Sequence, residues 1–227
     1  MILTKIVIGA SGAIGAAIAD RLEEQDDTVL RVARTTTPAL DLTDEASIKA
    51  VADHVREVGQ PVELVFDATG FLHGDGYMPE RSWRALDAEH MLLDYQLNTV
   101  GPALLMKHFL PLLQRDSRAV FATLSARVGS ISDNRLGGWH SYRASKAALN
   151  QMVRTCSIEL ARKNPEAICV AIHPGTVASR LSEPFSKSGL DVRTPEVAAE
   201  EILDVLDSLA PTDTGKLFDH KGKRVEF

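Results

Sequence analysis

The chain has 227 residues, which is enough for one sizeable hydrophobic core and slightly small for two domains. The hydrophobic fraction of 44% and the charged fraction of 25% are ordinary for a folded globular protein. The formal net charge is −6 without a long basic run, so we expect no nucleic-acid partner. No apolar run approaches the ~18 residues of a membrane span. The two cysteines and scattered histidines predict reduced thiols in a cytoplasmic protein and no metal site.

Strands and helices alternate along the first third of the chain. Short apolar runs ending in glycine or polar residues predict strands, and apolar residues at helical spacing predict helices. In chain order we expect a strand over 2–9, a helix over 13–25, strands over 28–34 and 38–42, a helix over 44–59 and a strand over 62–70.

The same alternation continues to the C-terminus. We expect a long helix over about 88–114, a strand over 118–125, a helix over 140–163, a strand over 167–175, a helix over 194–209 and a strand over 215–222. Repeated β-α-β units predict a Rossmann-type, doubly wound parallel sheet of about seven strands with helices on both faces. We interpret residues 1–227 as a single domain.

Sheets of this kind bind ligands beyond the carboxyl ends of their strands. The residues with unusual chemistry follow the predicted strands, namely 9–15, Arg34, 67–70, 125–130 and 174–179. The sequence therefore predicts a ligand site along this edge of the sheet.

The segment GASGAIG at residues 9–15 joins the first strand to the first helix. Its three glycines allow a sharp turn and a close approach to a pyrophosphate, while the helix N-terminus supplies free N–H groups. Its place after the first strand of a β-α-β run favours nucleotide binding over a glycine-rich turn without a ligand. The predicted cofactor contacts in this segment are Gly9, Ser11, Gly12, Ala13, Ile14 and Gly15.

The second strand ends in VLRVAR, where NAD-selective sites of this type carry an acidic residue for the ribose 2′-hydroxyl. Arg34 stands there instead and can bind a 2′-phosphate through charge-assisted hydrogen bonds. The alternative is a solvated surface arginine. We expect NADP(H) to be the preferred cofactor, and NAD(H) stays possible.

Tyr142 and Lys146 stand four residues apart in a predicted helix, so their side chains share one face. A free tyrosine titrates near ~10, and a neighbouring ammonium lowers the pKa of the phenol by stabilising phenolate. Proton transfer works best when the pKa of the acid is nearer ambient pH. The pair predicts a proton-donating tyrosine tuned by a lysine. The alternative is an amphipathic helix with a half-buried tyrosine and a solvated lysine.

Five segments in this order carry a family resemblance: GASGAIG (9–15), DL (41–42), NTVGP (98–102), SYRASKAALN (141–150) and HPGTVAS (173–179). With them the chain resembles the short-chain dehydrogenase/reductase family over essentially its whole length. Residues 124–150 and the ending GKLFDHKGKRVEF are most similar to the subgroup of C-factor-like signalling proteins and sniffer-like carbonyl reductases. The resemblance implies hydride transfer between a nicotinamide and a small carbonyl or alcohol substrate.

The resemblance also implies a role for each matching residue. Tyr142 would protonate the carbonyl oxygen, and Lys146 would bind the nicotinamide ribose and lower the pKa of the tyrosine. Asn98 would kink the long helix and hold a water in a proton relay, and Asp41 with Leu42 would contact the adenine. The remaining implied cofactor contacts are Ala68, Thr69, Gly70, Pro174, Gly175, Val177 and Ser179.

The sequence departs from the family pattern at several positions. Ala13 holds the middle site of the glycine turn, and DATG at 67–70 replaces Asn-Asn-Ala-Gly, which leaves the partner of Asp67 open. Ala126 occupies the position of the substrate-orienting serine. The hydroxyl before it, Ser125, and the hydroxyl beyond Gly129, Ser130, are both candidates, although alternate residues on a strand point to opposite faces. Ser125 is the predicted catalytic hydroxyl, and Ser130 is the alternative.

These departures keep other functions open. A weakly catalytic or non-catalytic NADP(H)-binding signalling protein of the C-factor type is the main alternative to a carbonyl reductase. Epimerase or dehydratase chemistry on a nucleotide sugar fits the glycine spacing, but the short chain argues against it.

Residues 180–193 predict a mobile lid over the substrate, with an apolar wall formed by Leu181, Phe185 and Leu190. Further residues that could border the pocket are His73, Trp139 and His140, with loop packing as the alternative for each. The resemblance implies a homodimer or homotetramer formed through the helices at about 88–114 and 140–163.

Overall fold

The computed structural model describes residues 4–74, 76–185 and 191–227. A seven-stranded sheet lies at its centre, in the order β2-β1-β3-β4-β5-β8-β9. The strands are β1 (Thr4–Ile8), β2 (Thr28–Val32), β3 (Val62–Asp67), β4 (Ala119–Leu124), β5 (Ala167–His173), β8 (Leu217–Asp219) and β9 (Arg224–Val225). All pair in parallel except β9, which runs antiparallel to β8 at one edge. The predicted doubly wound fold is confirmed, with one antiparallel strand added to it.

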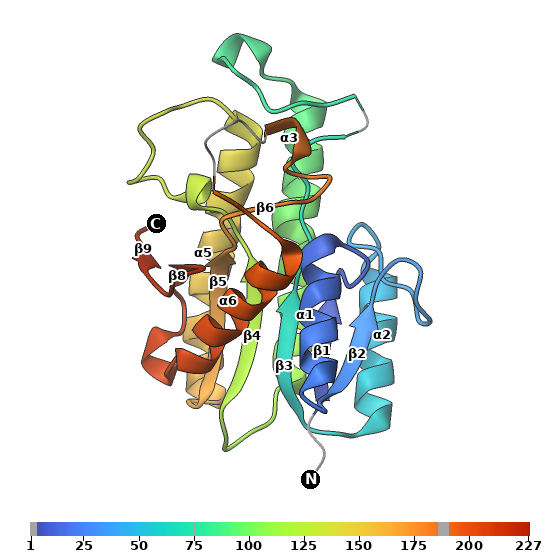
Figure 1. Ribbon diagram of the computed structural model, residues 1–227. Coiled ribbons are helices and arrows are strands. Elements are labelled where there is room, and N and C mark those ends of the chain that lie inside the picture. Colours follow the sequence, from blue (N-terminus) through green and yellow to red (C-terminus); the bar gives the residue numbers. More distant parts are fainter. Residues whose placement is uncertain (1–3, 75, 186–190) are drawn as a thin grey trace.

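Helices cover both faces of the sheet (Figure 1). On one face α1 (Ala13–Glu24) and α6 (Pro195–Ser208) pack against each other. The other face carries α2 (Glu45–Val58), α4 (Gly101–Phe109) and α5 (His140–Lys163), with α3 (Ala88–Tyr95) packed on α5. Each face has its own apolar cluster, and the central strands are buried on both sides, as the apolar sequences of β4 and β5 require.

The helix ends follow from local signals in the sequence. Asp44 begins α2 by accepting a hydrogen bond from the N–H of Ala46 at 2.9 Å, and Gly59 ends it in a left-handed conformation (φ +71°). Thr194 accepts from the N–H of Val197 at the start of α6. The predicted bounds of both helices agree with the structure to within a residue or two.

The predicted strand over 38–42 is wrong. This segment folds into a turn against the end of β2, because the N–H of Leu40 donates to the carbonyl of Ala33 at 3.0 Å and the N–H of Asp41 donates to Ser47 Oγ at 2.9 Å. Backbone donors used in this way cannot join a ladder. The buried side chain of Leu40 explains the strand-like apolar pattern.

The predicted long helix over 88–114 is interrupted. A π-helical turn, Gln96–Val100, separates α3 from α4, and the chain leaves α4 through a short 3₁₀ turn, Leu110–Leu112. The expected final strand over 215–222 is shorter, because Gly222 turns the chain back into the antiparallel β9.

The carboxyl ends of β1, β3, β4 and β5 all reach the same edge of the sheet, which is uppermost in Figure 1. A separate two-stranded ladder, β6 (Thr176–Val177) with β7 (Val192–Arg193), lies beyond this edge. The topology thus gathers the chemistry-bearing segments of the sequence in one region.

Candidate active site

A glycine turn closes the carboxyl end of β1. Gly9 has a left-handed backbone (φ +81°), and a Cβ on Gly15 would collide with the carbonyl oxygen of Gly9. Gly12 caps α1 without a side chain, no acidic residue lies in the first turn, and Ala13 is exposed. The free N–H groups of α1 and the positive end of its dipole are therefore accessible at this edge. The other predicted contacts of the turn are Ser11, which is exposed, and Ile14, which packs on the core.

Arg34 follows β2 on an exposed turn beside Asp41. Hydrogen bonds from the hydroxyl and the N–H of Thr43, at 2.7 and 2.8 Å, hold the pKa of the Asp41 carboxyl below its usual range, and the Arg34 charge adds to this effect. Leu42 packs so closely on Gly101 of α4 that a Cβ there would lie 2.8 Å from Leu42 Cβ. Because β2 pairs with β1, this rim adjoins the glycine turn.

Asp67 ends β3 and is fully buried. One of its carboxylate oxygens accepts from the N–H and the hydroxyl of Thr69 at 3.0 and 2.5 Å, and the other accepts from the Thr123 hydroxyl at 2.7 Å. Burial raises the pKa of Asp67, and these hydrogen bonds oppose the rise. The partners left open by the sequence are thus two threonines, which fix the segment that carries Ala68 against the glycine turn and Gly70 towards Lys146.

Asn98 lies in the π-helical turn and is fully buried. Its side chain accepts from the N–H of Phe71 at 2.9 Å and donates to the carbonyl of Phe71 at 2.8 Å and to Ser145 Oγ at 3.2 Å. Asn98 therefore joins three segments: the π turn, the chain after β3, and α5. π turns are frequent at functional sites, and this one is the interruption that the family resemblance implies for the long helix.

Tyr142 and Lys146 lie one turn apart on the buried face of α5. Lys146 Nζ is 5.9 Å from the centroid of the Tyr142 ring and donates to the carbonyl of Leu124, at the end of β4, at 2.9 Å. A Cβ on Gly70 would lie 3.6 Å from Nζ, and a Cβ on Gly129 would press against Lys146 at 2.8 Å. The structure thus brings the tyrosine and the lysine together, as their spacing predicts.

The charges at this pair differ from the expectation. Burial raises the pKa of Tyr142, and the Asp94 carboxylate adds to the rise. Burial lowers the pKa of Lys146 to about 8, against the pull of Asp67 and Asp94. The sequence predicts a lowered pKa for Tyr142, but here the amine is hydrogen-bonded at the end of β4 and desolvation dominates the phenol.

The two candidate serines have other partners in the structure. Ser125 Oγ donates to Asn150 Oδ1 at 2.7 Å, and Asn150 stands two turns beyond Tyr142 on α5. Ser130 Oγ donates to the backbone carbonyl of Glu226. Ala126, between them, packs in one buried cluster with Tyr142. The side chain that packs near the Tyr142 phenol at this position is therefore the methyl group of Ala126.

Aromatic side chains gather around the phenol of Tyr142. The Trp139 ring meets Tyr142 edge-on at 6.2 Å and Phe185 at 5.0 Å, and the His73 ring meets Phe185 at 5.6 Å. Leu72 is buried in the same cluster. Three of the side chains that the sequence proposes for the pocket, His73, Trp139 and Phe185, are thus brought together from three separate segments.

The chain after β5 forms the remaining side of the site. Pro174 leads into Gly175, which has a left-handed backbone (φ +73°) against the Arg193 side chain. Val177 is buried in β6, and Ser179 Oγ lies 3.3 Å from Ser182 Oγ. The pairing of β6 with β7 pins both ends of the predicted lid. Leu181 on the lid is exposed, whereas Leu190 lies outside the described residues.

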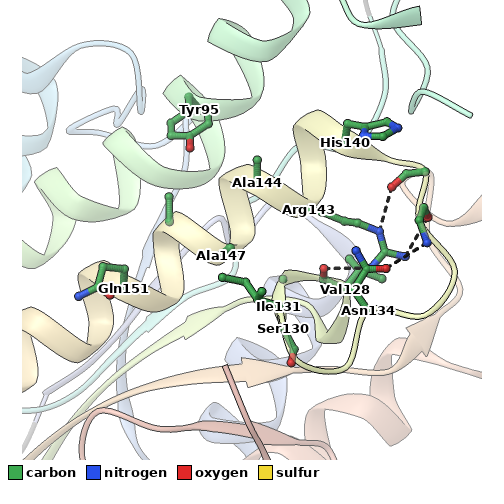
Figure 2. A pocket seen from close by; sticks show the side chains of 14 residues that line it. Tyr95, Val128, Ser130, Ile131, Asn134, His140, Arg143, Ala144, Ala147 and Gln151 are labelled. Atoms are coloured by element: carbon green, nitrogen blue, oxygen red, sulfur yellow. Dashed lines mark hydrogen bonds between the residues drawn. The ribbon is translucent and has the colours of Figure 1, made fainter. Parts of the chain in front are cut away.

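Figure 2 shows a separate cavity of about 590 Å³ on another side of α5, lined by Tyr95, Ala144 and His140 among others. Arg143 donates to the carbonyls of Gly138 and Val128 at 2.9 and 3.2 Å and so ties the loop before α5 to the helix. His140 therefore lines this cavity, whose lining does not include Tyr142 or Lys146.

Sequence reasoning did not single out Glu80, His90 and Asp94, which are buried behind Tyr142. The available signal was the helical spacing of His90 and Asp94, which places two polar side chains on one face of α3. Within the described ranges, no group of three or more His, Cys, Asp or Glu side chains could hold a metal ion. In the same residues, no helix is both long and apolar enough to cross a membrane.

Comparisons with known proteins agree with this geometry. The family model for short chain dehydrogenase matches residues 4–188. A 1-hydroxy-2-glutathionyl-2-methyl-3-butene dehydrogenase from Rhodococcus sp. is 29% identical, over 96% of each chain. The C-signal protein of Myxococcus xanthus is 34% identical over 64% of this chain and 85% of its own.

Solved structures give the same picture. An NADPH-bound carbonyl reductase from chicken fatty liver superposes with a TM-score of 0.85 and 26% identity, covering 100% of this chain and 99% of that one. The carbonyl reductase Sniffer of D. melanogaster has the same fold, with a TM-score of 0.83 and 20% identity over 100% and 99% of the two chains. On the family match and the shared architecture, the chain belongs to the short chain dehydrogenase family and is an oxidoreductase of that family.

Proposed function

We propose that the protein is an NADP(H)-dependent oxidoreductase that interconverts a small carbonyl compound and its alcohol, with Tyr142 as general acid and base. The observation that carries this proposal is that Tyr142, Lys146 and Asn98 lie close together on buried helix faces, with an apolar cluster around the phenol. The NADPH bound to the chicken carbonyl reductase supports the choice of cofactor.

The residues present fit a dinucleotide. A Cβ at Gly15 would collide with the Gly9 carbonyl oxygen, so glycine keeps the turn between β1 and α1 tight, and the first N–H groups of α1 are accessible to a pyrophosphate. Arg34 would hold the 2′-phosphate and Asp41 the adenine amino group, at the rim beside that turn. The remaining proposed contacts are Leu42, Ala68, Thr69, Gly70, Pro174, Gly175, Val177 and Ser179. When bound, this cofactor supplies or accepts a hydride at its nicotinamide ring.

Tyr142 would move the proton, and two further side chains would support it. Tyr142 donates its phenolic proton to the carbonyl oxygen in reduction and accepts it back in oxidation. Lys146 stabilises the resulting phenolate with its charge and binds the nicotinamide ribose. Asn98 and its neighbour Thr99 hydrogen-bond the π turn to Ser145 of α5. These bonds hold the part of α5 that carries Lys146 in place. Ser125 stays a prediction as the hydroxyl that orients the substrate.

The side chains around Tyr142 favour an apolar substrate. Leu72, Ala126, Trp139 and Phe185 form an apolar cluster with the phenol, so a hydrocarbon or aromatic group next to the carbonyl would lose contact with water against them. His73 offers a polar edge, although its Nε2 lies 3.0 Å from the carbonyl oxygen of Arg180.

A homodimer through α3, α4 and α5 completes the proposal. A largely apolar groove of about 720 Å³ runs between α4 and α5, and exposed apolar side chains on neighbouring elements are Leu92 of α3, Val100 of the π turn and Ile158 of α5. A second copy would cover this surface. Light scattering of the purified protein measures its mass, and a monomer at micromolar concentration would contradict this part of the proposal.

The function is tested by NADPH oxidation with a panel of apolar aldehydes and ketones. We expect turnover with at least one of them, and Tyr142→Phe should lower kcat by about 10²-fold or more, the usual weight of a general acid. The affinity for NADPH, measured by fluorescence titration, should stay within twofold. Tyr95→Phe, which removes an exposed phenol outside the site, is the matched control.

Two outcomes would overturn the proposal. Binding of NADPH without turnover on any carbonyl or alcohol would favour the signalling protein. Unchanged turnover in Tyr142→Phe would remove the tyrosine from the chemistry.

A further inference from the structure

Three buried titratable side chains lie behind Tyr142, and the proposed reaction does not use them. His90 on α3 has its Nδ1 3.5 Å from Glu80 Oε1 and its Nε2 3.8 Å from Asp94 Oδ2. The exposed fraction of the side chain is 3% for His90, 2% for Glu80 and 0% for Asp94. The Tyr77 ring stacks on His90 with a centroid distance of 4.8 Å. An imidazole therefore stands between two carboxylates inside the protein.

The Glu80 end of this cluster has a structural explanation. Its carboxylate accepts from the hydroxyl and, at 3.2 Å, from the N–H of Ser141, and its backbone carbonyl accepts from the N–H of Trp139. The Trp139 side chain does not cap α5, so Glu80 supplies the cap from a distant segment. A carboxylate at a helix N-terminus is stabilising. Hydrogen bonds from Ser141 outweigh burial and hold the pKa of Glu80 below its usual range.

The Asp94 end has no such explanation. Within the described residues neither carboxylate oxygen of Asp94 has a hydrogen-bond partner, and His90 Nε2 has none either. An unpaired buried carboxylate is costly, so the fold gains nothing from this charge. Its position is informative, because Asp94 stands one turn before Asn98 on the helix that packs against α5, and Asn98 Oδ1 and Lys146 Nζ lie 3.7 and 3.6 Å from the position that a Cβ on Gly70 would take.

The charged and titratable groups that face Asp94 come from three elements. His90 lies on its own helix, Glu80 comes from the segment before α3, and Tyr142 and Lys146 come from α5. Asp67 of β3 also attracts the charged form of Lys146. Asp94 and Asp67 are thus the two buried carboxylates that attract the buried ammonium.

We propose that Asp94 is a positioning residue for the reaction: its charge, coupled to His90, keeps Lys146 in the ammonium form beside Tyr142. This inference rests on the proposed roles of Tyr142 and Lys146. Burial alone drives Lys146 towards a neutral amine, which could not stabilise a phenolate. The same carboxylate keeps the proton on Tyr142 until a substrate takes it.

The titration ranges of the two groups are compatible with this role. Burial and the Glu80 charge raise the pKa of Asp94 to about 7, and the pKa of Lys146 is about 8. Asp94 is therefore mostly ionised at the pH where Lys146 is half deprotonated. Coupled groups titrate together, so a change at Asp94 moves the midpoint of Lys146.

The direct test is an NMR titration of the protein labelled with ¹³C at the Cε atoms of lysine. The Lys146 resonance is assigned with Lys146→Arg, and its shift is followed against pH without cofactor or turnover. We expect a midpoint near 8 in the parent protein. In Asp94→Asn the midpoint should fall by about half a pH unit or more, since the ammonium loses a nearby carboxylate.

Four further variants sharpen this titration. Asp94→Glu, which keeps the charge, should retain most of the parent midpoint. His90→Gln should lower the midpoint by less than Asp94→Asn, and the double variant should fall no further than Asp94→Asn alone, because His90 acts through Asp94. Glu89→Gln removes an exposed carboxylate from the same helix and should leave the midpoint unchanged.

An Asp94→Asn midpoint within about 0.2 unit of the parent would overturn the proposal. If Asp94→Asn does not fold, His90→Gln decides alone, and an unchanged midpoint there would contradict the coupling. If the protein turns over a substrate, the pH above which kcat falls should be lower in Asp94→Asn than in the parent, because Lys146 loses its proton at lower pH. Because the titration needs no substrate, its result stands apart from a failure of the proposed reaction.

Discussion

The two sides of Tyr142 are built in different ways. On the proposed cofactor side the site consists mainly of backbone: the Gly9–Gly15 turn, the N-terminus of α1 and the turn at Pro174–Gly175. On the substrate side it consists of side chains from separate segments, among them Leu72, Trp139 and Phe185. Backbone groups can bind the phosphate and ribose of a cofactor that many enzymes share. Side chains around the substrate, in contrast, select a particular substrate. The contrast implies that changes on the two sides should separate cofactor affinity from turnover.

The largest effect should come from the backbone side. In Gly15→Ala the new Cβ would collide with the Gly9 carbonyl, so the turn must open and NADPH affinity should fall by about 100-fold or more. Fluorescence titration with NADPH measures this. Gly12→Ala is the graded control, because its Cβ would lie 3.3 Å from the same oxygen and should cost less. If both variants bound NADPH as tightly as the parent protein, the turn would not be part of the cofactor site.

The next effect should appear at the rim after β2. Arg34→Asp should weaken NADPH by about tenfold or more and NADH by much less, since a charge-assisted contact with the 2′-phosphate becomes a repulsion. Titration with both cofactors gives the ratio. Arg31→Asp is the control, because Arg31 on β2 is already paired with Asp20 and Glu23. An equal loss of both cofactors in Arg34→Asp would place the phosphate elsewhere.

On the substrate side, the methyl group of Ala126 takes the place of the serine hydroxyl that the family pattern has there. Ala126→Ser adds a hydroxyl in the cluster around Tyr142, and we expect kcat/KM for a ketone to rise by about tenfold, from one new donor to the carbonyl oxygen. NADPH affinity should not change. Ser125→Ala tests the neighbouring position, where the hydroxyl is bonded to Asn150. A larger loss in Ser125→Ala than the gain in Ala126→Ser would make Ser125 the orienting residue.

The smallest expected effect is on stability. Burial raises the pKa of Asp94 to about 7, from an ordinary value of 3.8. A carboxyl with a raised folded-state pKa stabilises the fold below its unfolded pKa, and that contribution is lost as pH rises through about 7. Asp94→Asn, which is neutral throughout, should gain a few degrees in Tm over the parent at about pH 8.5 and less at about pH 6. A Tm difference independent of pH would contradict a buried ionised Asp94.

The contrast between the two sides also explains what the sequence could predict. The Gly9–Gly15 turn and the Tyr142–Lys146 spacing are local patterns, so their positions follow from the order of strands and helices. The exception was residues 38–42, where the burial of Leu40 imitates a strand although the backbone makes turn hydrogen bonds.

Contacts between segments that are distant in the chain could not be predicted from the sequence. No local pattern places Asn98 against Phe71, or commits the Ser125 hydroxyl to Asn150. The Glu80–His90–Asp94 cluster joins a loop to a helix and depends on how α3 packs against α5. The raised pKa of Tyr142 likewise comes from burial, which only the folded structure sets.

A crystal structure of the protein with NADPH tests the central claim most directly. The account predicts that Tyr142 Oη points at C4 of the nicotinamide, that Lys146 Nζ binds the nicotinamide ribose, and that the pyrophosphate lies on the Gly9–Gly15 turn. A nicotinamide bound away from Tyr142, with the phenol still enclosed by Leu72 and Trp139, would contradict it.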